Sequence, residues 1–245
     1  YDEEFYQYIS QGAVNSAQQL LPALLAVLPD PVDSVLDVGC GAGAWLSVWK
    51  SMGAKIVGLD GDYLNADQLM IDADDFMPLD LSTSFDLERR FTLVQSLEVA
   101  EHLSEKATMG LVESLVTASD FILFSAAIPF QDGRGHINAQ WPDYWAHMFT
   151  ERGFVPLDFI RSKIWNDKQI RHWYRQNILM FVKEEEMHNV KIPGPDRRNN
   201  IVPLSLVHPE TYLKKTNQMS SVKGSLRLFR RAAKKWIERK ISDGS

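Results

Sequence analysis

The chain has 245 residues, 45% of them hydrophobic, which is enough for one domain of ordinary size and an extension. Its net charge of −6 argues against a body that lies along nucleic acid, because such proteins usually present a basic face. Cys40 is the only cysteine, which excludes an intrachain disulfide and fits a reducing compartment. No apolar run approaches the ~20 residues that span a bilayer, and residues 1–8 are too acidic for a secretory signal. These features predict a cytoplasmic protein, and they leave its oligomeric state open.

In chain order, the apolar spacing first predicts a helix over 12–28, which Pro29 ends. An apolar strand over 34–38 then runs into a glycine-rich turn, and a helix over 44–52 and a strand over 55–59 follow. This order of elements is a β-α-β unit with glycines at its first crossover. It predicts two parallel strands.

The alternation of strands and helices then continues. We expect strands near 76–81, 91–97 and 121–125, with helices over 104–118 and 142–152. Two further strands, over 154–161 and 177–183, have no predicted helical segment between them and should pair antiparallel. The predicted fold class is therefore α/β, with a doubly wound, mostly parallel, Rossmann-like sheet of seven strands that ends in an antiparallel hairpin.

The composition changes behind this domain, to which we assign residues 1–185. Residues 186–221 are predicted to be a linker, with a run of proline, glycine and asparagine at 193–200. Residues 222–245 form a basic helical tail. Its predicted helix over 222–241 has one apolar face (Leu226, Phe229, Ala233, Trp236, Ile237, Ile241) and a basic remainder (Lys223, Arg227, Arg230, Arg231, Lys234, Lys235, Arg239). Such a helix suits peripheral contact with an anionic inner membrane face, packing on the first domain or a partner subunit, or plain solvation.

The glycine turn is a candidate binding site. Gly39, Gly41 and Gly43 let a ligand approach the backbone, but the same glycines also fit a dinucleotide fingerprint or simple packing of helix on sheet. Asp37, just before them, would repel a pyrophosphate and attract a cationic ligand, directly or through water. Asp60 ends the next strand and can accept hydrogen bonds from both hydroxyls of a ribose.

These residues resemble a known family. Residues 35–43, Val-Leu-Asp-Val-Gly-Cys-Gly-Ala-Gly, closely resemble the first motif of class I S-adenosylmethionine-dependent methyltransferases, and residues 56–60 resemble the second. The resemblance covers about residues 12–183 and implies S-adenosylmethionine as the cofactor. It also implies that Asp80 meets the adenine amino group, although an acid at this place also commonly caps a loop.

A second cluster follows the strand over 91–97, at the sheet edge where α/β folds bind ligands. If residues 98–102 form a helical turn, Glu98 and Glu101 share a face and His102 lies beside them. His136 comes from a long loop that leaves the same edge. Two carboxylates and imidazoles at the mouth of a site can bind a divalent cation or hold a proton.

The set Glu98, Glu101, His102 and His136 resembles the E-x-x-E-H motif of ubiquinone-biosynthesis O-methyltransferases, with the added histidine of small-RNA 2′-O-methyltransferases. The resemblance implies that these four side chains bind Mg²⁺ or another divalent cation, which activates an acceptor hydroxyl. Two alternatives stay open. His136 can act as a metal-free general base with Glu98 and His102 beside it, or the cluster can be structural, as in metal-free class I enzymes.

The acceptor is predicted from two segments, 138–145 and 167–177, in which aromatic side chains alternate with Arg, Gln and Asn. Such surfaces suit a sugar or another small polyhydroxylated acceptor, or a glycan. The first domain also resembles bacterial methyltransferases of surface-glycan and secondary-metabolite pathways. We therefore expect an O-methyltransferase. The alternatives are N- or phosphate-directed methylation of a small molecule, RNA 2′-O-methylation, a nicotinamide-dependent oxidoreductase and a non-catalytic S-adenosylmethionine-binding partner protein.

Overall fold

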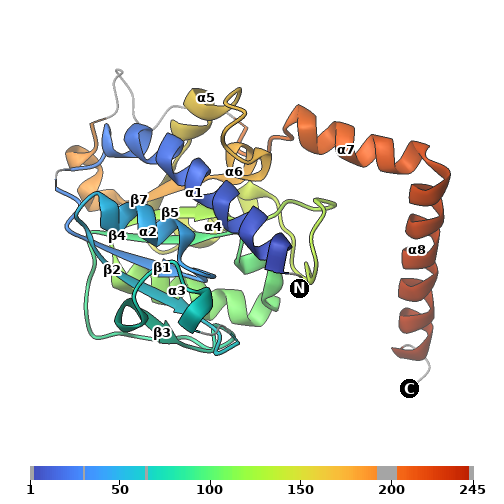
Figure 1. Ribbon diagram of the computed structural model, residues 1–245, viewed down its shortest axis with the longest axis horizontal. Helices are drawn as coiled ribbons and strands as arrows, with labels where there is room; N and C mark the ends of the chain where they lie inside the picture. The colour runs from blue at the N-terminus through green and yellow to red at the C-terminus, as the bar shows by residue number, and fades with distance from the viewer. Residues whose placement is uncertain (1–2, 30, 64–65, 192–202, 243–245) are drawn as a thin grey trace. The chain divides into compact units, whose positions relative to one another are not determined.

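The computed structural model describes residues 3–29, 31–63, 66–191 and 203–242, and these fall into two units, Tyr1–Leu206 and Val207–Ser245 (Figure 1). The first unit contains a seven-stranded sheet in the order β3-β2-β1-β4-β5-β7-β6. Its strands are β1 (Ser34–Val38), β2 (Lys55–Asp60), β3 (Phe76–Pro78), β4 (Leu93–Leu97), β5 (Phe121–Ser125), β6 (Phe154–Leu157) and β7 (Leu179–Lys183). The first five are parallel, and β7 pairs antiparallel with both β5 and β6. The predicted fold class is confirmed.

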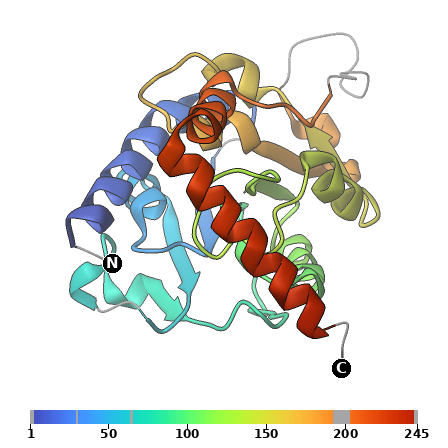
Figure 2. The ribbon, with the colours of Figure 1, turned by 90° about the vertical axis from the view of Figure 1, so that its right-hand side faces the viewer.

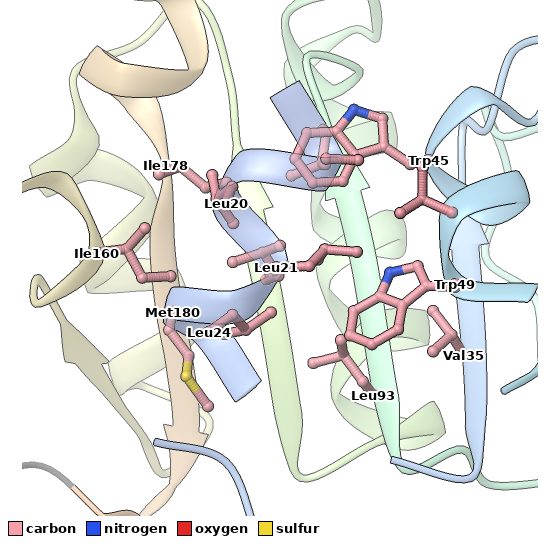
Figure 3. Close-up of a cluster of buried hydrophobic side chains, with 14 of the residues drawn as sticks. Leu20, Leu21, Leu24, Val35, Trp45, Trp49, Leu93, Ile160, Ile178 and Met180 are labelled. Atoms are coloured by element: carbon pink, nitrogen blue, oxygen red, sulfur yellow. The ribbon is translucent and has the colours of Figure 1, made fainter. Parts of the chain in front are cut away.

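Helices cover both faces of the sheet, because successive strand residues point to opposite faces and both sets are apolar. The helices α1 (Glu3–Leu25) and α2 (Ala44–Ser51) pack on one face, and α3 (Glu105–Ala118) and α4 (Pro142–Thr150) pack on the other. Figure 3 shows Leu20, Leu21 and Leu24 of α1 between the tryptophans of α2 and the side chains of β7 and its neighbours. Leu20, Leu21 and Leu24 are fully buried.

The connection from β6 to β7 contains two short helices, α5 (Ile160–Ile164) and α6 (His172–Asn177). The prediction that no helical segment lies between these strands was therefore wrong. Five- and six-residue helices are shorter than the 11 to 18 residues over which helical spacing can be recognised. Short 3₁₀ turns occupy four other places: η1 (Ala66–Gln68), η2 (Ala73–Asp75), η3 (Ala100–His102) and η4 (Glu184–Asn189).

The second unit consists of α7 (Pro209–Ser220) and α8 (Val222–Ser242), and Figure 2 shows α8 as one continuous helix. The helix α8 spans the residues 222–241 over which a basic helix was predicted. In contrast, α7 lies within residues 186–221, which were expected to be a linker. The His208 ring accepts a hydrogen bond from the Glu210 N–H at 3.1 Å, and Pro209 occupies the first turn, so ordinary N-terminal signals start this helix. The run at 193–200 lies outside the described residues.

None of the described helices combines the length and the apolar composition needed to cross a bilayer.

Candidate active site

The glycine turn joins β1 to α2 and leaves its backbone open at one point. Gly39, Gly41 and Gly43 all have positive φ, of +83°, +53° and +80°. A β-carbon at Gly39 would meet Val99, and one at Gly43 would meet Ile71, whereas one at Gly41 would meet no described atom within 4 Å. Gly41 is therefore the position at which a ligand can approach the main chain.

Asp60 lies at the end of β2, directly beside this turn. Its carboxylate accepts hydrogen bonds from the Gly41 N–H at 2.6 Å, from its neighbour Gly61 N–H at 2.7 Å and from the Tyr63 hydroxyl. The Tyr63 hydroxyl forms the kind of bond that a ribose hydroxyl would form with an acid at this place. No role was predicted for Tyr63, because nothing in its sequence context marks it.

A cleft of about 1300 Å³ extends from the glycine turn to the second cluster. One end is lined by the glycine turn, by the ends of β2 and β3 and by the loops after them: Gly39, Gly41, Asp60, Gly61, Asp62, Tyr63, Pro78, Leu79, Asp80, Leu81 and Ser82. The other end is lined by residues that follow β4 and β5 and by α6: Glu98, Val99, His102, Leu103, Asp132, Gly133, Arg134, His136 and Trp173. The glycine turn with Asp60 and the segment of Glu98, His102 and His136 thus line the same cleft.

Asp80 lines this cleft and is exposed. Its carboxylate accepts a hydrogen bond from the Ser82 N–H at 2.9 Å, and hydrogen bonding from Ser82 lowers its pKa. This geometry is that of a loop cap, in which both the backbone and the side chain of Ser82 bond to Asp80.

Asp37 and Gly43 are not among the lining residues. Asp37 is 3% exposed, and its carboxylate accepts a hydrogen bond at 2.8 Å from Gln95, whose own oxygen accepts one from the Trp49 indole at 3.0 Å. Burial raises the pKa of Asp37 to about 7, against the opposing hydrogen bond from Gln95. Asp37 is therefore buried next to the glycine turn and does not line the cleft.

Three of the four predicted metal ligands meet. Glu101, His102 and His136 each offer a ligand atom, and these atoms lie within 4.8 Å of one another. Nε2 of His136 is 3.9 Å from Oε1 of Glu101, and the two imidazole rings are 5.0 Å apart and nearly perpendicular. The N–H groups of Ile137 and Asn138 donate to the Glu101 carbonyl at 2.9 and 3.0 Å, which ties the loop of His136 to η3.

The Glu101 side chain is 1% exposed, and neither of its carboxylate oxygens accepts a well-aligned hydrogen bond from the described residues, although the backbone N–H groups of Glu101 and Ala127 lie close enough to lower its pKa in part. Burial, and then the charge of Glu98, raise the pKa of Glu101 well above its usual range. A buried carboxylate without partners is costly unless a cation or a proton accompanies it. This site can therefore hold either one.

Glu98 lies outside this group of three. The helical turn expected over 98–102 begins only at Ala100, and Glu98 itself has a φ of +60°. Its half-buried carboxylate accepts hydrogen bonds from the Asn177 amide at 2.9 Å and from the Gln131 amide at 3.0 Å. The role of Gln131 had not been predicted, because only the folded loop brings it to Glu98.

Among the described residues, none of Asp37, Glu98 and Glu101 forms an ion pair with lysine or arginine. Of these three acids, only Glu98 lines the cleft. The described lining contains five acids (Asp60, Asp62, Asp80, Glu98 and Asp132) and one lysine or arginine, Arg134. Such a cavity favours a positively charged ligand over a pyrophosphate.

A seven-stranded sheet of this order, with a glycine turn and an acid at the ends of β1 and β2, has the fold and site of class I S-adenosylmethionine-dependent methyltransferases. A family model described as a methyltransferase domain matches residues 8–158, more than half of the chain. The chain belongs to this family. The match decides against the nicotinamide-dependent oxidoreductase that the glycines alone had left open.

Two curated relatives are ubiquinone biosynthesis O-methyltransferases of Rhodopseudomonas palustris. The one from strain HaA2 is 33% identical over 76 residues, which are 29% of this chain and 30% of that protein. The one from strain BisB5 is 28% identical over 95 residues, which are 36% of this chain and 38% of that protein. The chain thus matches about a third of the length of these relatives.

Two solved structures share the fold. The magnesium protoporphyrin IX methyltransferase of Synechocystis PCC 6803 with bound S-adenosylmethionine has a TM-score of 0.51 at 18% identity, covering 75% of this chain and 86% of that one. The methyltransferase in complex with the Haloferax volcanii Trm112 methyltransferase activator has a TM-score of 0.52 at 14% identity, covering 74% and 94%.

Proposed function

We propose that the protein transfers a methyl group from S-adenosylmethionine to a hydroxyl oxygen of a small polyhydroxylated acceptor such as a sugar. The observation that carries this proposal is the cleft, which the glycine turn and Asp60 line at one end and His102 and His136 at the other. Its volume of about 1300 Å³ exceeds the ~300–1,000 Å³ of ordinary ligand pockets, so a cofactor and an acceptor fit together. The names of the two curated relatives support oxygen as the methylated atom.

The cofactor end is proposed to work through three groups. Asp60 accepts the ribose hydroxyls in place of the Tyr63 hydroxyl, and the main chain at Gly41 lies against the ligand. Asp37 supplies negative charge beneath the turn, which favours the cationic cofactor. Asp80, which is exposed in the lining of the cleft, is assigned to the adenine amino group.

Glu101, His102 and His136 fit a divalent cation, because their ligand atoms converge and the Glu101 oxygens accept no well-aligned hydrogen bond from the described residues. A cation held there would supply Lewis-acid chemistry that lowers the pKa of the acceptor hydroxyl. Two imidazoles among three ligands favour a transition-metal ion such as Mn²⁺ over Mg²⁺.

The chain also offers a proton acceptor that needs no metal. His136 Nε2 lies 3.9 Å from the Glu101 carboxylate, which would stabilise the protonated imidazole. In this version His136 takes the proton of the acceptor hydroxyl, and His102 lies edge-on against it. The loop of His136 and the ring of Trp173 line the same end of the cleft, and an aromatic ring suits the C–H face of a sugar.

The decisive experiment incubates the protein with labelled S-adenosylmethionine and with small-molecule and glycan fractions, before and after removal of metal by a chelator. We expect label on a hydroxyl of a polyhydroxylated product, lost in chelator and restored by Mn²⁺. If the activity is complete in chelator, no cation is needed, and the version in which His136 removes the proton is favoured. Absence of transfer to every fraction contradicts the proposal.

For location, we propose peripheral contact of α8 with an anionic membrane surface. Val222, Leu226, Phe229 and Trp236 are all more than half exposed, and eight lysines and arginines accompany one glutamate in this helix. Deletion of residues 222–245 should abolish sedimentation with vesicles that contain phosphatidylserine. Equal sedimentation of both proteins, or none by the full chain, contradicts this proposal.

A further inference from the structure

Glu98 has a backbone conformation that a glutamate rarely adopts. Its φ of +60° lies in the left-handed region, which glycine would occupy without cost. The Glu98 N–H donates to the Ser125 carbonyl at 2.9 Å, so this conformation is fixed between the ends of β4 and β5. Such a conformation costs free energy and persists where surrounding contacts hold it, so the contacts of the Glu98 side chain decide what it does.

The Glu98 carboxylate holds a group of amide side chains. Its Oε1 accepts a hydrogen bond from Asn177 Nδ2 at 2.9 Å, and its Oε2 accepts one from Gln131 Nε2 at 3.0 Å. Asn177 also donates to Gln131 Oε1 at 3.0 Å, and Gln176 donates to the oxygens of Gln131 at 3.0 Å and of Asn177 at 2.8 Å. We call these four residues (Glu98, Gln131, Gln176 and Asn177) the amide cluster.

The amide cluster joins three segments that are far apart in the sequence. Glu98 follows β4, Gln131 lies in the loop after β5, and Gln176 and Asn177 end α6. The loop after β5 carries His136 and α6 carries Trp173, and both of these side chains line the acceptor end of the cleft. The amide cluster therefore connects the loop of His136 to the helix of Trp173, and these two segments form two walls of this end of the cleft.

The two glutamates of the E-x-x-E-H motif differ in what they contact. Both oxygens of Glu98 accept hydrogen bonds from amides. Glu101 instead offers an oxygen to the group that it forms with His102 and His136, and its Oε1 lies 3.9 Å from Nε2 of His136. A metal ligand needs an available oxygen lone pair directed at the ion. Glu101 meets this condition, whereas Glu98 is not among the residues whose ligand atoms converge, and each of its oxygens already accepts a hydrogen bond from an amide.

We propose that Glu98 is a positioning residue, which fixes the loop of His136 and the helix of Trp173 around the acceptor end through Gln131 and Asn177. The inference rests on the proposed function for the importance of these two walls. It assigns different roles to Glu98 and Glu101, although the motif presents them as equivalent ligands.

The test compares Glu98→Gln with Glu101→Gln in the full chain, with Glu88→Gln as the matched control. Glu88 is also a glutamate with positive φ, of +51°, but it is exposed and lies outside the cleft. Glu98→Gln places an amide donor against other amide donors. Amide hydrogen exchange, read segment by segment, and the affinities for Mn²⁺ and S-adenosylhomocysteine are measured for each variant.

We expect Glu98→Gln to accelerate exchange in residues 128–138 and 172–177 by at least about tenfold, because a hydrogen bond to a charged group is lost at both walls. Exchange elsewhere, and S-adenosylhomocysteine affinity, should stay within about threefold of the parent protein. Glu98→Gln should weaken Mn²⁺ by less than about tenfold, whereas Glu101→Gln abolishes its binding. Glu88→Gln should change none of these quantities.

The double variant E98Q/N177D exchanges the carboxylate and the amide, and we expect it to restore slow exchange in part. If Glu98→Gln alone fails to fold, the exchange rates of this double variant test the proposal in its place. Unchanged exchange in both segments overturns the proposal, and so does loss of Mn²⁺ in Glu98→Gln as complete as in Glu101→Gln. If the parent protein binds no Mn²⁺ and transfers no methyl group, the proposed function fails, and the exchange data still decide the role of Glu98.

Discussion

Gly133 lies closely against His136 at the end of the cleft that the two histidines line. A β-carbon at Gly133 would lie 1.9 Å from Nε2 of His136, a distance at which one of the two groups must move. Gly135, with a φ of +71°, lies beside His102 in the same loop. The glycines of this loop thus let the backbone lie against both imidazoles.

We predict that Gly133→Ala lowers methyl transfer and Mn²⁺ affinity by at least about tenfold, because the imidazole is pushed away from Glu101. Gly53→Ala is the control: Gly53 has a φ of +93°, but a β-carbon there meets no described atom within 4 Å. This control should lose stability and keep Mn²⁺ binding. Equal Mn²⁺ affinity in Gly133→Ala and the parent, measured by calorimetry, would refute the assignment.

Asp37 should make cofactor binding depend on pH. Burial raises its pKa to about 7, so it is neutral in acid and charged in mild base. Its charged form attracts the sulfonium, so S-adenosylmethionine should bind more tightly as the pH rises from 6 to 8. S-adenosylhomocysteine has no sulfonium charge and should gain less. Calorimetry of both ligands over this range measures the difference, and parallel curves would contradict it.

Asp37 should lower the free energy of unfolding of the ligand-free protein. Because the pKa of Asp37 is higher in the folded than in the unfolded chain, the loss of stability grows from about pH 4 to pH 7 and is constant above. Asp37→Asn should therefore raise the free energy of unfolding at pH 8 by up to about 4 kcal/mol, and by less at pH 5. Urea denaturation at the two pH values tests this. An equal effect at both would contradict the prediction.

At the level of single residues, part of the site can be predicted from the sequence. Glu101, His102 and His136 meet as the motif and its later histidine indicate, because the carboxyl ends of β4 and β5 are adjacent in the sheet. Glu98 departs from the pattern, because its left-handed conformation turns its side chain toward amides from two distant segments. Sequence spacing carries no signal for such long-range partners.

Among the elements, the β6–β7 connection depends on one buried arginine. The Arg161 guanidinium, 1% exposed, pairs with Asp158 and donates to the carbonyls of Gln176 at 3.0 Å and Leu204 at 2.7 Å. It therefore ties the end of α6 to the segment that follows the sheet.

Arg161→Met should destabilise the fold by about 3–5 kcal/mol, because it leaves the carboxylate of Asp158 buried and unpaired. The double variant R161M/D158N removes that charge and should recover part of the loss. Chemical denaturation of the two variants measures both effects. A loss below about 1 kcal/mol in Arg161→Met would contradict the prediction.

The strands and long helices follow from apolar spacing, whereas α5, α6 and α7 do not. The central parallel strands β4 and β5 are buried on both faces and are mostly apolar, so their places can be predicted from composition. α6 has six residues, and tertiary packing, such as the edge-on contact of Tyr174 with Trp45, holds it. Such packing cannot be inferred from six residues of sequence.

Across the whole chain, the charge is unevenly distributed. The net charge is −6, yet α8 contains eight of the 26 lysines and arginines and one acid. The residues outside α8 are therefore strongly acidic, which agrees with a cleft suited to cationic ligands and argues against nucleic acid as the acceptor.

The most direct measurement of the central claim is a crystal structure of the full chain soaked with S-adenosylhomocysteine and Mn²⁺. We predict ribose hydroxyls on Asp60, the ligand's sulfur directed toward the end of the cleft where Glu101, His102 and His136 meet, and Mn²⁺ among those three side chains. A nucleoside bound at the opposite edge of the sheet, or with its sulfur turned away from His136, would contradict the account.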